Sequence, residues 1–220
     1  EVIIFDEHDR HRTLWEKFGF IRTLRNKKFD TVFLLHRSFT RTLICYLAGI
    51  PERIGYITAK RRFLLTRKIV PPDPKTLHRL DYYLTLIDKA GLKIEDRFPE
   101  FFIEEEDRKF VDTFLEKNSV TKDDYLVVFN PGGNWHLKRW PKENWAGLAD
   151  RLMNEFKAKV VINGGPQDMA LAQDIKGLMR SEAISAAGAF NLKQLGALSV
   201  RADLFITADS GPLHIANASG

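Results

Sequence analysis

The chain has 220 residues, of which 44% are hydrophobic and 29% are charged. This composition is typical of a globular protein and excludes a disordered or fibrous chain. The length allows one large domain or two small ones. No apolar run approaches the roughly 18 residues that a membrane-spanning helix needs, and the first residues do not have the pattern of a signal peptide. The single cysteine, Cys45, lies in an apolar stretch. We therefore expect a buried thiol rather than a reactive one, and a cytoplasmic protein.

The positive charge is concentrated in the first third of the chain. Residues 1–75 hold 16 Lys and Arg against 8 Asp and Glu, a net charge of +8, whereas the remaining residues hold 18 against 21, a net charge of −3. Five bases lie close together: Lys60, Arg61, Arg62, Arg67 and Lys68. They predict either a solvated face or a surface for an anionic partner, such as a membrane or a phosphorylated lipid. Nucleic acid is not expected, because the sequence lacks zinc-ligand spacing, a recognition-helix signature and interleaved aromatic residues.

Hydrophobic periodicity predicts alternating strands and helices in the first half of the chain. The expected elements are a strand over 1–5, an amphipathic helix over 12–26 with Leu14, Phe18, Ile21 and Leu24 facing inward, a strand over 31–35, a helix over 40–48, a proline-rich turn over 71–74 and a helix over 78–90.

The same alternation continues in the second half. The expected elements are a helix over 107–117, a strand over 125–129, a helix opened by Pro141 with Trp145, Leu148, Leu152 and Phe156 on one face, a strand over 159–162, a helix over 168–179, a weak strand over 183–186, a helix capped by Asn191 and a strand over 204–208. Such alternation indicates parallel sheets with helices on their faces. We therefore predict an α/β fold with one domain over residues 1–99 and a second over 100–220.

Three polar loops that contain glycine follow three of the predicted strands, at residues 130–134, 163–168 and 209–214. In a parallel sheet the carboxyl ends of the strands share one edge, and ligands bind at that edge. The three loops should therefore form one site. Glycines, a cation, carboxylates and amides together predict a ligand with phosphate groups and several hydroxyls.

The first loop and the residues after it supply the phosphate-binding groups. Gly132 and Gly133 let backbone amides approach an anion closely, although an ordinary turn would use the same glycines. Asn134 belongs to the same loop. Lys138 is placed to reach back toward the loop, unless it is a solvated surface lysine.

The other two loops carry acids. Asp168 is either a helix-capping residue or the carboxylate that binds a ribose diol. Asp209 would bind hydroxyls or a metal, because an acid beside a diphosphate is otherwise repelled. It is followed by Ser210, Gly211 and Pro212 at a predicted helix N-terminus, where anions bind. His214 either donates to a phosphate or is a core histidine. We expect no metal, since the loops contain no Asp-x-Asp pair and no His or Cys ligand spacing.

Several of these segments resemble the lipopolysaccharide heptosyltransferase family. The resemblance rests on Asn-Pro-Gly-Gly-Asn-Trp at 130–135, Lys-Arg-Trp-Pro at 138–141 and Asp-Ser-Gly-Pro-Leu-His-Ile-Ala at 209–216. The segments 29–38 and 53–56 also resemble this family, so that the similarity runs through nearly the whole chain. Lys-Arg-Trp-Pro leans toward the second heptosyltransferase of the inner core.

The resemblance implies the GT-B architecture, with two Rossmann-like domains and a cleft between them. It also implies an inverting transfer of heptose from ADP-L-glycero-D-manno-heptose to the lipopolysaccharide inner core, without cofactor or metal, at the cytoplasmic face of the inner membrane. Lys138 would then face the diphosphate as the catalytic cation, and Asp168 the adenosine ribose. Asp209, Ser210, Gly211, Pro212 and His214 would contact the diphosphate and heptose, together with Gly132, Gly133 and Asn134. The basic first half would face the anionic acceptor or leaflet.

The sequence departs from the family pattern at both ends. The N-terminal strand and glycine-containing loop, with the aspartate thought to act as base, have no counterpart, and neither do the last strand and helices. We therefore expect an internal fragment of a longer enzyme, with an incomplete first and second domain. Two alternatives stay open: a glycosyltransferase that uses another nucleotide sugar, and a non-catalytic module that binds a nucleotide sugar.

Overall fold

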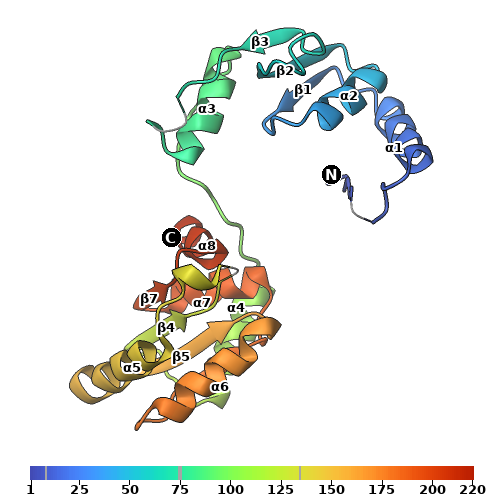
Figure 1. The fold of residues 1–220 in the computed structure, drawn as a ribbon. Helices are drawn as coiled ribbons and strands as arrows, with labels where there is room; N and C mark the ends of the chain where they lie inside the picture. Colours follow the sequence, from blue (N-terminus) through green and yellow to red (C-terminus); the bar gives the residue numbers. More distant parts are fainter. Residues whose placement is uncertain (8, 74–75, 134) are drawn as a thin grey trace. The chain divides into compact units, whose positions relative to one another are not determined.

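The chain was studied as a computed structural model that describes residues 1–7, 9–73, 76–133 and 135–220 (Figure 1). It forms two compact units, Glu1–Arg97 and Phe98–Gly220. The division falls close to the domain boundary expected at residue 99. Each unit is built around its own parallel sheet. None of the described helices is long and apolar enough to cross a membrane.

The first unit contains a three-stranded sheet in the order β1-β2-β3. Its elements are α1 (Leu14–Asn26), β1 (Thr31–Leu34), α2 (Phe39–Leu47), β2 (Glu52–Tyr56), β3 (Arg67–Ile69) and α3 (Arg79–Lys89). Alternate residues of a strand point to opposite faces of the sheet. Leu34 accordingly packs in one cluster with residues of α1 and α2, whereas Phe33 packs in another with residues of α3. Cys45 is buried in the first cluster, as predicted.

Two expectations for the start of the chain are wrong. No strand precedes α1 in the part of the chain that the structure describes, so residues 1–5 do not form the predicted strand. Leu14 and Phe18 are 73% and 58% exposed instead of facing inward. Of the four residues, Ile21 and Leu24, in the second half of α1, reach the core, and Phe20 packs against it as well. The spacing of the apolar residues correctly predicted a helix. The N-terminal turns of this helix, however, extend beyond the core cluster against which its second half packs.

Arg61 is not part of a solvated basic surface. Its side chain is fully buried, and its guanidinium donates to the carbonyl oxygens of Tyr56, at 2.6 and 3.0 Å, and of His36, at 2.6 Å. It also donates to the hydroxyl of Thr42 at 3.3 Å. Burial and the nearby charge of Arg37 lower the pKa of Arg61. Arg61 therefore holds the end of β2 to the segment that follows β1, whereas the other four bases of the cluster are exposed.

The second unit contains a four-stranded sheet in the order β6-β5-β4-β7. Its elements are α4 (Glu105–Lys117), β4 (Leu126–Asn130), α5 (Lys142–Phe156), β5 (Lys159–Gly164), α6 (Met169–Leu178), β6 (Ile184–Ala187), α7 (Leu192–Arg201), β7 (Leu204–Thr207) and α8 (Gly211–Ser219), with two short 3-10 turns, His136–Lys138 and Pro166–Asp168. The elements differ from the predicted ranges by a few residues at their ends.

Helices cover both faces of this second sheet. Val127 and Phe129 pack with residues of α5 and α6, and Leu126 and Val128 pack with residues of α4 and α7. β4 and most of β5 are buried from end to end, which explains their nearly continuous apolar sequences. Phe156, predicted on the inward face of α5, is 60% exposed because it ends the helix beyond the core. The side chain of Asn191 caps α7 by accepting a hydrogen bond from the backbone N–H of Gln194, as predicted.

Candidate functional site

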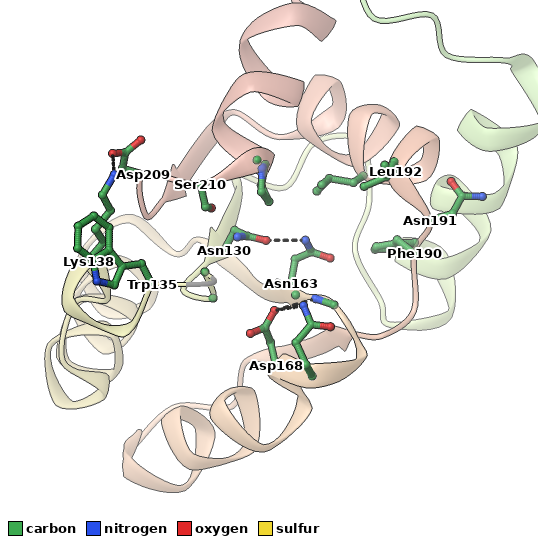
Figure 2. A pocket seen from close by; sticks show the side chains of 18 residues that line it. Asn130, Trp135, Lys138, Asn163, Asp168, Phe190, Asn191, Leu192, Asp209 and Ser210 are labelled. Atoms are coloured by element: carbon green, nitrogen blue, oxygen red, sulfur yellow. Dashed lines mark hydrogen bonds and ion pairs between the residues drawn. The ribbon is translucent and has the colours of Figure 1, made fainter. Parts of the chain in front are cut away.

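A cavity of about 400 Å³ lies at the carboxyl edge of the second sheet. Residues of all three polar loops line it, so the structure brings together loops that lie up to about 80 residues apart in the sequence (Figure 2). The strand order explains the position. From β4 the chain adds β5 and β6 on one side, whereas β7 pairs with β4 on the other side. The boundary between β4 and β7 is therefore a topological switch point, the place where open α/β sheets bind their ligands.

The segment from Gly133 to Pro141 is built so that one cation reaches the mouth of this cavity. Arg139 closes the loop by donating to the carbonyl oxygen of Gly133 from two nitrogens, at 2.7 and 2.9 Å. Trp140 packs edge-on against buried Trp145 of α5, with ring centroids 5.3 Å apart. Pro141 directly precedes α5. Arg139, Trp140 and Pro141 therefore fix the backbone that carries Lys138.

Lys138 and Asp209 form an ion pair, with 2.5 Å between Nζ and Oδ2. Figure 2 shows the pair beside the ring of Trp135, whose centroid is 5.6 Å from the same ammonium nitrogen. Lys138 lowers the pKa of Asp209 by a hydrogen bond and by its charge, and His214 adds a smaller contribution. Both side chains of the pair are partly exposed. An anionic ligand can therefore compete with Asp209 for the ammonium at low cost.

Asp168 is buried, and its Oδ2 accepts a hydrogen bond from the backbone N–H of Gly165 at 3.0 Å. Its carboxylate also packs against the first loop. A Cβ atom on Gly132 would lie 2.4 Å from the Asp168 Cγ, and one on Gly164 would lie 2.7 Å from the Asp168 Cβ. The capping role is thus present in the structure, and the ribose role stays a prediction. Gly132 is required here because Asp168 occupies the space of a side chain.

The third loop carries α8, whose N-cap residue Ser210 makes no side-chain capping hydrogen bond. The first turn of a helix has backbone N–H groups without helical partners, which favour an anion. Asp209, Ser210, Gly211 and Pro212 line the cavity, together with Gly132, Gly133, Lys138 and Asp168. His214 is exposed and is not among the lining residues. It lies in the first turn of α8, and it makes a small contribution to the lowered pKa of Asp209. Asn134 lies outside the described residues.

The asparagines that begin the first two loops form an amide pair, which the sequence did not predict. Asn163 donates from Nδ2 to Oδ1 of Asn130 at 2.9 Å, and both side chains are buried at the cavity floor (Figure 2). Oδ1 of Asn163 has no hydrogen-bond partner among the described residues. A signal was available, because asparagine disfavours strands and here follows an apolar run in both β4 and β5.

The other end of the cavity is more apolar. Phe190, Leu192 and Leu195, from the loop after β6 and the start of α7, line it together with Asn191. The sequence analysis identified Asn191 only as a helix cap. Among the described residues, no group of three or more His, Cys, Asp and Glu side chains is arranged to hold a metal ion.

Comparison with known proteins agrees with this arrangement. Residues 18–220 match glycosyltransferase family 9 (heptosyltransferase). The chain is 28% identical over 208 residues to lipopolysaccharide heptosyltransferase 2 of Salmonella typhimurium, which covers 89% of this chain and 59% of the relative. It is 26% identical over 214 residues to a lipopolysaccharide core heptosyltransferase of Haemophilus influenzae, covering 94% of this chain and 58% of that protein.

Solved structures share the fold. A glycosyl transferase family 9 structure from Veillonella parvula superposes with a TM-score of 0.88 at 30% identity, covering 99% of this chain and 63% of that one. The Escherichia coli ADP-heptose lipopolysaccharide heptosyltransferase II gives a TM-score of 0.74 at 26% identity, covering 94% and 65%. The predicted α/β fold with two parallel sheets is therefore confirmed. The chain spans about three fifths of the length of these relatives, and it belongs to glycosyltransferase family 9, the heptosyltransferase family.

Proposed function

We propose that this chain is the donor-binding part of an enzyme that transfers heptose from ADP-L-glycero-D-manno-heptose to the inner core of lipopolysaccharide. The proposal also includes inversion at the anomeric carbon and independence of metal ions. Family membership supports the reaction class, and the names of the relatives in Salmonella, Haemophilus and Escherichia support the donor and acceptor.

The observation that carries the proposal is the shape and polarity of the cavity at the switch point. Its volume of about 400 Å³ is in the range of small-ligand sites. The apolar end at Phe190, Leu192 and Leu195 suits a nucleobase. Asp168, whose carboxylate packs against the glycine loops, suits the ribose. The turn at Gly132 and Gly133, the start of α8 and Lys138 suit a diphosphate.

In this arrangement Lys138 acts on the leaving group. The acceptor hydroxyl gives its proton to a carboxylate base of the enzyme and forms a bond to the anomeric carbon on the face opposite the nucleotide. The bond to the diphosphate oxygen breaks, and ADP leaves with the electron pair. Negative charge therefore grows on the diphosphate in the transition state. A fixed ammonium and a helix N-terminus lower the free energy of that state more than that of the bound donor. When the diphosphate takes Lys138, the carboxylate of Asp209 becomes available to sugar hydroxyls.

The acceptor in this proposal is an anionic, lipid-anchored saccharide at the cytoplasmic face of the inner membrane. The net charge of +8 on residues 1–75 supports contact with such a partner, since anionic lipids attract basic segments. The protein would act there as a peripheral enzyme.

The proposal is tested by heptose transfer with the intact protein, ADP-heptose and an inner-core acceptor, with and without EDTA. We expect transfer with inversion and less than twofold change on chelation. A loss of more than about tenfold that Mg²⁺ restores would assign roughly 1.4 kcal/mol of the barrier to an ion and refute metal independence. Donor binding without any transfer would favour the non-catalytic module, and faster transfer from another nucleotide sugar would replace the donor.

A further inference from the structure

Trp135 is a large aromatic residue that lines the cavity of the second unit without being packed into the protein. It is 58% exposed. Among the described residues, its ring belongs to neither core cluster of this unit and pairs with no other aromatic ring. Trp140 and Trp145, by contrast, pack against each other. A tryptophan that stays open in a binding cavity indicates a contact with the ligand.

The backbone near Trp135 is held at two points, so that the ring is presented from a defined turn. The carbonyl oxygen of Trp135 accepts a hydrogen bond from the backbone N–H of Lys138 at 3.0 Å, which closes the 3-10 turn His136–Lys138. Arg139 holds the carbonyl oxygen of Gly133 from two nitrogens. Because tryptophan has only two rotatable side-chain bonds, placing its large surface against a ligand costs little conformational entropy.

Trp135 lies at the end of the cavity that carries the charges. Figure 2 shows it with Lys138 and Asp209, whereas Phe190 and Leu192 lie at the opposite end. The ammonium nitrogen of Lys138 is 5.6 Å from the centroid of the Trp135 ring. In the proposed function the nucleobase occupies the apolar end and Lys138 binds the diphosphate. The group next to Trp135 is therefore the one on the far side of the diphosphate, which is the transferred sugar.

The chemistry of the indole ring suits a sugar better than a phosphate. The face of an aromatic ring carries partial negative charge, which repels phosphate oxygens and attracts the weakly positive C–H groups on the face of a sugar ring. Contact through this face leaves the sugar hydroxyls free. The carboxylate of Asp209 can accept hydrogen bonds from these hydroxyls once the diphosphate has taken Lys138. An aromatic face beside a carboxylate thus matches a ring with many hydroxyls.

We propose that Trp135 is a specificity-determining residue, which binds the transferred sugar of the donor by packing its ring against the C–H face of that sugar. This inference rests on the proposed function for the direction in which the nucleotide lies in the cavity. It adds a contact that the sugar makes and that ADP alone does not make.

The test is calorimetric titration of the intact protein with ADP and with ADP-heptose, without acceptor, and its readout is the ratio of the two affinities. Trp135→Ala should lower the affinity for ADP-heptose relative to ADP by roughly three- to tenfold, the scale of one aromatic contact. Trp135→Phe keeps an aromatic face and should retain most of the ratio. Leu137→Ala is the matched control, because Leu137 is 74% exposed in the same turn but does not line the cavity. It should leave both affinities unchanged.

An action of Trp135 through Lys138 alone gives a different result. Lys138→Ala should weaken both ligands and leave their ratio close to that of the parent, because both ligands carry the diphosphate. If Trp135→Ala weakens ADP as much as ADP-heptose, the ring supports the ammonium or stacks on the nucleobase, and the inference is overturned.

The inference alone is also overturned if both ligands bind and Trp135→Ala leaves the ratio within about twofold of the parent. An equal loss of the ratio in Leu137→Ala overturns it as well, since the whole turn would then be disturbed. A parent protein that binds neither ligand refutes the proposed function together with this inference.

Discussion

Lys138 and Asp209 are 71 residues apart in the sequence, and their side chains meet at 2.5 Å across the mouth of the cavity. One follows β4 and the other follows β7, which are neighbours in the sheet. The pair therefore spans the switch point of the second unit. In the proposed reaction this ion pair opens when the donor diphosphate binds.

Replacing Lys138 by alanine should lower kcat by roughly 10²–10³-fold, the scale for removal of one preorganised charge or donor. The melting temperature should change by no more than about 2 °C, because the side chain is partly exposed. Lys142→Ala is the matched control. Lys142 forms a similar exposed pair with Asp174, at 2.8 Å, outside the cavity, and its loss should leave kcat unchanged. A Lys138→Ala enzyme with normal kcat would contradict the leaving-group role.

The pKa of Asp209 should rise toward its ordinary value in Lys138→Ala, because the hydrogen bond and charge that lower it are removed. Carboxyl chemical shifts followed by NMR against pH measure this directly. A lowered pKa means that the contribution of the pair to stability is present above the ordinary aspartate value of about 3.9. That contribution is lost as the pH falls through the lower, folded value. An unchanged Asp209 pKa in the variant would mean that the pair does not form in solution.

Gly132→Ala should lower the free energy of unfolding of the second unit by about 1–3 kcal/mol, the usual cost of forcing a group into filled space. The new Cβ would meet the carboxyl of Asp168 at 2.4–2.5 Å, and this buried side chain would have to move. Gly133→Ala provides the comparison, since its Cβ would have its nearest contact at 3.6 Å, from Ser210. Equal stabilities of the two variants in urea titrations would show that Asp168 does not fill the space beside Gly132.

Arg61→Ala should destabilise the first unit by about 3 kcal/mol or more, because it removes a fully buried side chain and leaves the carbonyl groups of buried Tyr56 and of His36 without their guanidinium donor. Arg62→Ala, at the adjacent exposed position, should stay within about 0.5 kcal/mol. Urea unfolding followed by circular dichroism measures both. Similar midpoints for the two variants would place Arg61 on the surface.

Much of the candidate site could be predicted from the sequence for one physical reason. Parallel strands bring their carboxyl ends to one edge, so loops that follow such strands meet without any knowledge of the packing. This reasoning placed Gly132, Lys138, Asp168 and Asp209 around one cavity. It does not decide the position of His214, which is not among the lining residues, because the packing of α8 determines which of its faces turns toward the cavity.

The first unit was harder to predict, because its elements are short and carry charges. β2 and β3 contain Glu-Arg-Ile-Gly-Tyr and Arg-Lys-Ile, in which no alternation predicts a strand. Arg61 and Arg62 are adjacent in the sequence, and only the loop after β2 determines that the first is buried and the second exposed. The apolar spacing of α1 likewise does not reveal that Leu14 and Phe18 extend past the core.

The central claim is that the cavity at the switch point of the second unit binds an adenosine diphosphate donor, and calorimetric titration tests it most directly. The intact protein, titrated with ADP, UDP and GDP in the absence of divalent metal, should bind one ADP at least tenfold more tightly than UDP or GDP. Lys138→Ala should weaken that binding, whereas Lys142→Ala should not. No heat of binding with ADP, or equal affinity for all three nucleotides, would contradict the account.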